Sequence, residues 1–91
     1  MDIKINSKVK KFQEDTNFLG WYYDVNGNYC GIVGTYLFCV FVNSDTDELE
    51  LTISYSWDIY ECNTIEWLTI EDVPLTQVNH FIRSFINENY R

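Results

Sequence analysis

Residues 48–58 read ELELTISYSWD, and apolar and polar side chains alternate along the whole stretch. Side chains of a strand point alternately to the two faces of its sheet, so this period of two predicts a strand with one buried side and one wet side. The predicted buried side carries Leu49, Leu51, Ile53, Tyr55 and Trp57. The predicted wet side carries Glu48, Glu50, Thr52, Ser54, Ser56 and Asp58.

Further strands are predicted upstream. Residues 36–42 (YLFCVFV) are apolar on both faces, which is typical of a central strand covered on both sides. Residues 18–25 are aromatic and β-branched, and Asn26-Gly27 after them is the preferred sequence of a type I′ turn. Residues 28–33 should therefore return as a partner strand. Gly31 and Gly34 indicate a bulge, a bend or a close backbone contact.

The two ends of the chain favour helices. Residues 2–6 alternate like a short strand, and Ser7 is a candidate cap for a helix through Gln13 that buries Val9 and Phe12. A continued strand is the open alternative there. Downstream, residues 62–70 predict another strand. Residues 72–75 then open a helix with Pro74 in its first turn, and its apolar stripe consists of Val78, Phe81, Ile82, Phe85 and Ile86.

The predicted fold is one α+β domain over residues 1–91. We expect an antiparallel sheet of about four to five strands, with the C-terminal amphipathic helix packed on one face. A chain of 91 residues has a modest core, and its high aromatic content of 18% argues against disorder. The longest continuous apolar run is far shorter than a membrane helix, so no membrane association is expected.

Charge is the most informative feature of the composition. The net charge is −8, and no Lys or Arg occurs from Glu14 through Ile82. A surface of one sign attracts oppositely charged partners and repels nucleic acid. We therefore expect no direct nucleic-acid binding, and a basic protein as partner, such as a nucleic-acid-binding nuclease or CRISPR effector. Acidity that serves solubility alone is the alternative. The four N-terminal lysines either neutralise this field or extend toward a second partner.

The candidate partner-binding residues are carboxylates. Along one strand face, Glu48 and Glu50 should lie about 6.8 Å apart, at about 3.4 Å rise per residue. DNA presents one charge per roughly 3.4 Å along each strand, so such a row could imitate phosphates. A solvated sheet face explains the same positions equally well. The first group consists of Asp45, Asp47, Glu48, Glu50 and Asp58, and the second group of Glu61, Glu66, Glu71 and Asp72.

No catalytic or cofactor motif is apparent. His80, the single histidine, falls on the polar helix face without a nucleophile or orienting carboxylate in the sequence around it. The three cysteines lack zinc-finger spacing, which predicts buried thiols in a reducing, cytoplasmic setting. Asn43, Asp45 and Asp47 copy the first positions of a calcium loop, but the turn glycine and the bidentate glutamate are absent. We expect no enzyme activity, no metal and no cofactor.

In size, acidity and Asn/Ile/Tyr-rich composition, the chain resembles the small acidic proteins that phages use against host nucleases. These include anti-CRISPR and anti-restriction proteins. The resemblance implies a stoichiometric, non-enzymatic inhibitor, with DNA mimicry as one mode of action. Two alternatives stay open. One is an immunity protein against a nuclease toxin, and the other is a subunit of an oligomer, including a homodimer, that uses residues 36–42 at its interface.

Overall fold

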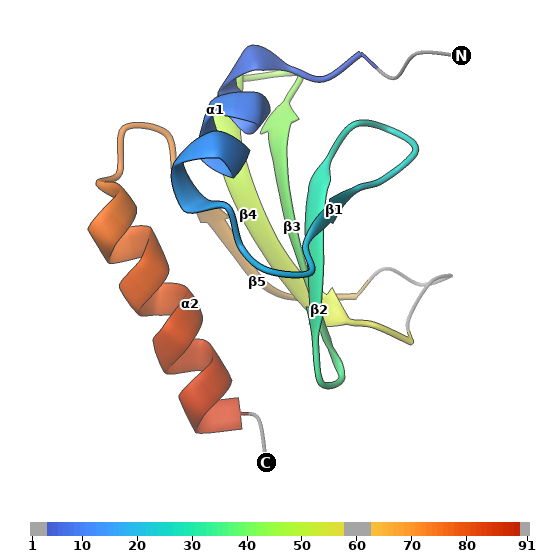
Figure 1. Cartoon of the computed structure of the whole chain (residues 1–91), viewed down its shortest axis with the longest axis vertical. Helices are drawn as coiled ribbons and strands as arrows, with labels where there is room; N and C mark the ends of the chain where they lie inside the picture. Colours follow the sequence, from blue (N-terminus) through green and yellow to red (C-terminus); the bar gives the residue numbers. More distant parts are fainter. Residues whose placement is uncertain (1–3, 58–62, 90–91) are drawn as a thin grey trace.

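The computed structural model describes residues 4–57 and 63–89. Its centre is one antiparallel sheet (Figure 1). Within these residues the strands are β1 (Tyr22–Tyr23), β2 (Tyr29–Val33), β3 (Tyr36–Asn43), β4 (Glu48–Tyr55) and β5 (Thr64–Thr69), and their order across the sheet follows the chain. Helix α1 (Ser7–Thr16) precedes the sheet and α2 (Leu75–Asn89) follows it. The predicted α+β fold is confirmed. No described helix has the length and apolar character needed to cross a bilayer.

The alternation along β4 sorts the two faces of the sheet as predicted through Ile53. The prediction of a buried Tyr55 and Trp57 is wrong: they are 37% and 69% exposed, and their rings stack on one another where the strand ends. Leu51 and Ile53 are buried and pair with Val40 and Phe38 of β3, so all four side chains lie on one face. Both helices pack on this face, because their buried side chains join the same core. Its helical members are Val9 and Phe12 from α1, and Val78, Ile82 and Phe85 from α2.

The N-terminal segment forms the helix and not the continued strand. Asn6, with extended φ and ψ of −62° and 139°, caps α1 because its side chain accepts the N–H of Lys8 at 2.8 Å. The predicted cap, Ser7, is instead the first helical residue. The strand predicted at residues 2–6 is not formed by residues 4–6, and the rest of it lies outside the described residues.

The strand predicted at residues 18–25 is much shorter than expected. Only Tyr22 and Tyr23 pair with β2. The chain before them turns, with Gly20 at φ 84°, and this turn directs Trp21 onto the core face, where its ring stacks on Phe38 at a centroid distance of 5.8 Å. The position of Trp21 also explains why residue 31 is a glycine, because a Cβ at residue 31 would lie 2.2 Å from Cε2 of the indole. The predicted close contact at Gly31 is thus with a side chain.

The hairpin between β1 and β2 has a three-residue loop where a two-residue type I′ turn was predicted. Of Asn26 and Gly27 only the glycine has positive φ, at 80°. The N–H of Gly27 donates to the carbonyl of Asp24 at 3.1 Å, and the pair Asp24 and Asn28 closes the loop through a backbone hydrogen bond of 2.9 Å. The Asp24 carboxylate accepts the backbone N–H groups of Asn26 and Asn28, which stabilises this longer loop.

The two segments after β4 largely follow the sequence pattern. The strand predicted at residues 62–70 is observed as β5, and Cys62 lies outside the described residues. Helix α2 begins one residue after Pro74, whose carbonyl accepts the first helical hydrogen bonds. Its apolar stripe faces the sheet, as predicted, with Phe81 and Ile86 half-buried beside the core.

Candidate functional site

Several predicted carboxylates meet at one end of the molecule, where the β3–β4 hairpin and the β5–α2 loop approach the start of α1 (Figure 1). Lys8 of α1 lies among them. Its Nζ is 2.9 Å from Glu71 Oε1 and 3.8 Å from Asp47 Oδ2, and it also donates to the main-chain carbonyl of Asp47. We call Asp45, Asp47, Glu48, Glu71 and Asp72 the acidic end.

Glu71 and Lys8 each shift the pKa of the other. The hydrogen bond from Lys8, followed by that from the backbone N–H of Leu49 at 2.7 Å, lowers the pKa of Glu71. The hydrogen bond to Glu71 raises the pKa of Lys8, with smaller contributions from the charges of Asp47 and Asp72. This lysine therefore offsets part of the local field, one of the two roles expected of the N-terminal lysines. Asp45, Asp47 and Asp72 stay exposed and Glu48 half-buried.

Glu50 is the main exception to the predicted acidic face. It points to the side of β4 away from the helices, as expected, but it is only 7% exposed. Its two carboxylate oxygens accept hydrogen bonds from Asn43 Nδ2 at 2.8 Å and Thr69 Oγ1 at 3.2 Å. The expectation of a solvent-facing carboxylate here is wrong, because neighbouring strands supply both partners and cover the group.

The other predicted binding residues do not join the acidic end. Glu66 is exposed on the edge strand β5, where it pairs with Ile53 and so lies on the helix side of the sheet. Asp58 and Glu61 lie outside the described residues. Of the nine predicted carboxylates, the structure brings Asp47, Glu71 and Asp72 together around Lys8. Asp45 and Glu48 belong to the same β3–β4 hairpin as Asp47, whereas Glu50 and Glu66 are separate from this group.

The face of the sheet opposite the helices is partly uncovered. Ile32 and Trp67 on this face are 55% and 58% exposed, and Tyr22 at the edge is 46% exposed. Between them Leu37 and Phe41 of β3 are half-buried, and Phe41 meets Trp67 at a centroid distance of 6.1 Å. The prediction that β3 is covered on both sides is thus wrong for this second face, because both helices pack on the first.

The two minor sequence candidates have ordinary structural roles. His80 is exposed on α2, and its Nε2 lies 3.5 Å from Ser84 Oγ one turn along; no described carboxylate pairs with it. In the calcium-like segment both ends of the Asn43 amide are hydrogen-bonded, since Oδ1 accepts the N–H of Asp45 at 2.9 Å while Nδ2 donates to Glu50. That segment is the polar hairpin loop expected from its missing calcium ligands.

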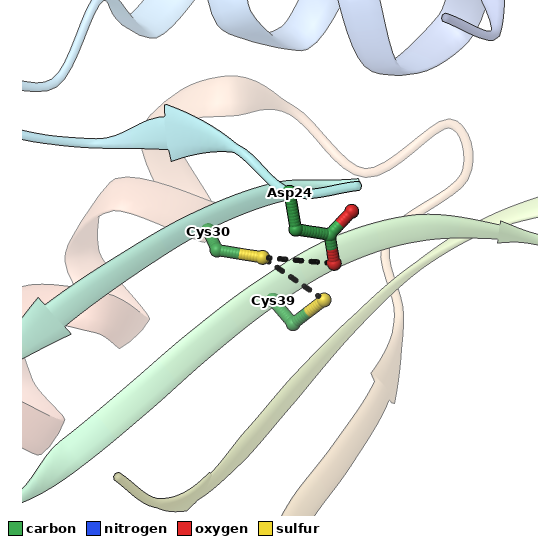
Figure 2. Close-up of side chains that lie close together, drawn as sticks. All are labelled: Asp24, Cys30 and Cys39. Atoms are coloured by element: carbon green, nitrogen blue, oxygen red, sulfur yellow. Dashed lines mark hydrogen bonds between the residues drawn. The ribbon is translucent and has the colours of Figure 1, made fainter. Parts of the chain in front are cut away.

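A cluster that the sequence pattern does not predict lies on the uncovered face. Cys30 of β2 and Cys39 of β3 are directly paired across the strands, and Asp24 of the β1–β2 loop turns toward them (Figure 2). The two sulfurs are 3.5 Å apart, and Cys30 Sγ is 3.7 Å from Asp24 Oδ2. The hydrogen bond with Cys39, followed by burial, raises the pKa of Cys30, and the same bond lowers the pKa of Cys39.

The sequence carries little sign of this cluster. The two cysteines are nine positions apart, and only the register of β2 against β3 places them opposite one another. A register shifted by one residue would direct them to opposite faces. The predicted hairpin before Cys30 was the one available indication that Asp24 lies near them. Compared with known proteins, the chain matches no family model, no curated protein and no solved structure.

Proposed function

We propose that this protein is a non-enzymatic binding protein that docks its acidic end on a basic surface of a partner protein. The observation that carries the proposal is that Asp47, Glu71 and Asp72 surround the Lys8 ammonium group, while Asp45 and Glu48 add their charge from the adjoining hairpin. A concentrated negative field speeds association with a positive surface and selects against acidic partners. The total charge of −8 acts in the same direction.

The partner class follows from the same charge argument. Proteins that handle nucleic acid carry the basic footprint that binds phosphates. A nuclease or CRISPR effector would be inhibited if the acidic end occupied that footprint, which is how a phage anti-defence protein or a nuclease immunity protein acts. In this proposal the groups that imitate phosphates are Asp45 and Asp47 on the hairpin and Asp72 on the neighbouring loop. The row of Glu48 and Glu50 predicted from the sequence does not serve, because Glu50 is buried.

The test compares two charge-reversed variants as immobilised baits in a bacterial lysate. D45K/D47K/D72K changes the acidic end, whereas E14K/E88K changes exposed carboxylates on the two helices. The wild-type protein and E14K/E88K should retain a basic nucleic-acid-binding protein that elutes as salt rises, and D45K/D47K/D72K should not. With the purified partner, the acidic-end variant should associate at least about tenfold more slowly at low salt.

Competition with duplex DNA or RNA separates an inhibitor from a simple binder. If the acidic end covers a nucleic-acid groove, the nucleic acid and this protein must exclude one another from the partner. Equal retention of the partner by the wild type and D45K/D47K/D72K would contradict the proposed surface. Simultaneous binding of protein and nucleic acid would contradict inhibition by occupancy of the groove.

A second candidate function rests on the uncovered sheet face. Exposed Ile32 and Trp67 beside half-buried Phe41 form an apolar surface of the kind that buries against another subunit. A homodimer or a larger complex would cover it, through the outward side of β3. Light scattering decides this: a dimer that dissociates in Trp67→Glu supports the second candidate, and a monomeric wild type argues against a homo-oligomer.

A further inference from the structure

Three metal-ligating side chains meet on the uncovered face of the sheet. Asp24, Cys30 and Cys39 each offer one donor atom, and these atoms all lie within 4.8 Å of one another (Figure 2). Cys30 is buried, while Asp24 and Cys39 are half-buried, so the group is shielded but still reachable from solvent. The cluster is separate from the acidic end, and its function does not depend on the proposed partner.

Two of the three donor separations are close to those of ligands around one tetrahedral ion, and the third, between Cys39 and Asp24, is at most 4.8 Å. Zinc binds sulfur at about 2.3 Å and carboxylate oxygen at about 2.0–2.2 Å. In a tetrahedron, two such sulfurs lie about 3.8 Å apart, and a sulfur and an oxygen about 3.5 Å apart. The distances here are 3.5 Å between the Cys30 and Cys39 sulfurs and 3.7 Å from Cys30 Sγ to Asp24 Oδ2. Side-chain adjustments alone would let the three donors share an ion, because the paired strands already hold the two sulfurs 3.5 Å apart.

Hydrogen bonds around Asp24 orient it for this role. Its Oδ1 accepts the backbone N–H groups of Asn26 and Asn28, both at 2.9 Å. Its Oδ2 faces the Cys30 thiol at 3.7 Å and also lies 3.4 Å from Asn28 Nδ2. Such outer contacts are typical of metal-ligating carboxylates, because they hold the ligand in place before the ion arrives. The cysteines are held equally well, since both belong to paired strands inside the sheet.

We propose that Asp24, Cys30 and Cys39 form a binding site for a thiophilic divalent ion, with zinc as the best match. Two thiolates and one carboxylate are a ligand set that favours zinc over magnesium or calcium, which prefer oxygen alone. The three side chains fill three of the four tetrahedral positions. The fourth position is open to water or to an incoming donor. Binding displaces the thiol protons to solvent, so metal uptake releases acid.

Cobalt(II) is the probe for the test, because its thiolate complexes absorb in the near ultraviolet and its tetrahedral complexes absorb in the visible. The wild-type protein, kept reduced with a phosphine, should bind one Co²⁺ with both absorptions, and one equivalent of Zn²⁺ should remove them. C30S and C39S should each lose the charge-transfer absorption expected for two thiolates. D24N removes a direct ligand and should weaken binding by at least the roughly 10- to 100-fold that loss of an outer partner costs. C62S, which leaves the three donors intact, should bind like the wild type.

Several results would overturn the site. One is that the reduced wild-type protein takes up no Co²⁺ or Zn²⁺ at micromolar concentrations. A second is that the C39S variant binds the ion as tightly as the wild-type protein. Another is a protein in which Cys30 and Cys39 form a disulfide, detected by a mass lower by two hydrogens, and in which reduction restores no metal binding. Far-UV circular dichroism of each variant shows whether lost binding reflects lost ligands or lost fold, and the wild-type titration decides the proposal even where a variant fails to fold.

Discussion

Replacement of Gly31 by alanine probes the contact that directs Trp21 into the core. The added Cβ would lie 2.2 Å from Trp21 Cε2, whereas carbon atoms in contact are about 3.5–4.0 Å apart. The indole must therefore move by more than about 1 Å. That shift disturbs its ring contacts with Phe38 at 5.8 Å and Tyr29 at 5.2 Å. Overpacking costs about 1–3 kcal/mol and each aromatic contact contributes about 0.5–1.5 kcal/mol, so we expect a loss of about 2–4 kcal/mol.

Urea unfolding followed by far-UV circular dichroism measures this loss as a change in the free energy of unfolding. Gly20→Ala is the control without a steric contact: Gly20 has φ 84°, and apart from its chain neighbours no atom lies within 4 Å of the place that an alanine methyl group would take, so only the backbone cost of about 1–2 kcal/mol applies. The decisive measurement is a double-mutant cycle with Trp21→Ala. Without the indole, Gly31→Ala should cost less than about 0.5 kcal/mol. An equal cost in both backgrounds would refute the reasoning.

Two further predictions concern the buried and paired carboxylates. Glu50→Gln keeps an acceptor for Asn43 and should cost under about 1 kcal/mol in urea unfolding, whereas Glu50→Ala removes the buried acceptor of the half-buried Asn43 amide and should cost about 1–3 kcal/mol; equal losses would contradict the hydrogen-bonded role. The pKa of Glu71 is lowered in the folded state, so its contribution to stability is present above the unfolded pKa of about 4.3 and is lost as pH falls through the folded pKa. The wild-type urea midpoint should therefore drop more steeply below pH 5 than that of Glu71→Gln, and parallel curves would argue against the pairing with Lys8.

The helix and strands with a regular pattern could be predicted because burying one face of such an element requires apolar residues at the spacing of that element. Leu49, Leu51 and Ile53 of β4 and the apolar stripe on α2 each lie on one face, and the structure packs those faces into the core. The prediction of burial from the alternation fails at the end of the stretch, where Tyr55 and Trp57 are exposed. The same reasoning failed at residues 18–25. Their aromatic content suits a strand, yet the core accepts Trp21 only when the chain turns at Gly20. The local composition of a segment does not determine which distant residues its aromatic rings will contact.

For the candidate sites, the sequence by itself determined the kinds of groups present: a chain of net charge −8, with carboxylates but no cations through its middle, and isolated cysteines. Only the tertiary structure decided which of these groups act together. Strand register buried Glu50 and placed Cys30 opposite Cys39, and the docking of α1 brought Lys8 to Glu71. These outcomes depend on contacts between residues far apart in the chain, whose geometry comes from packing the whole core and not from any local pattern.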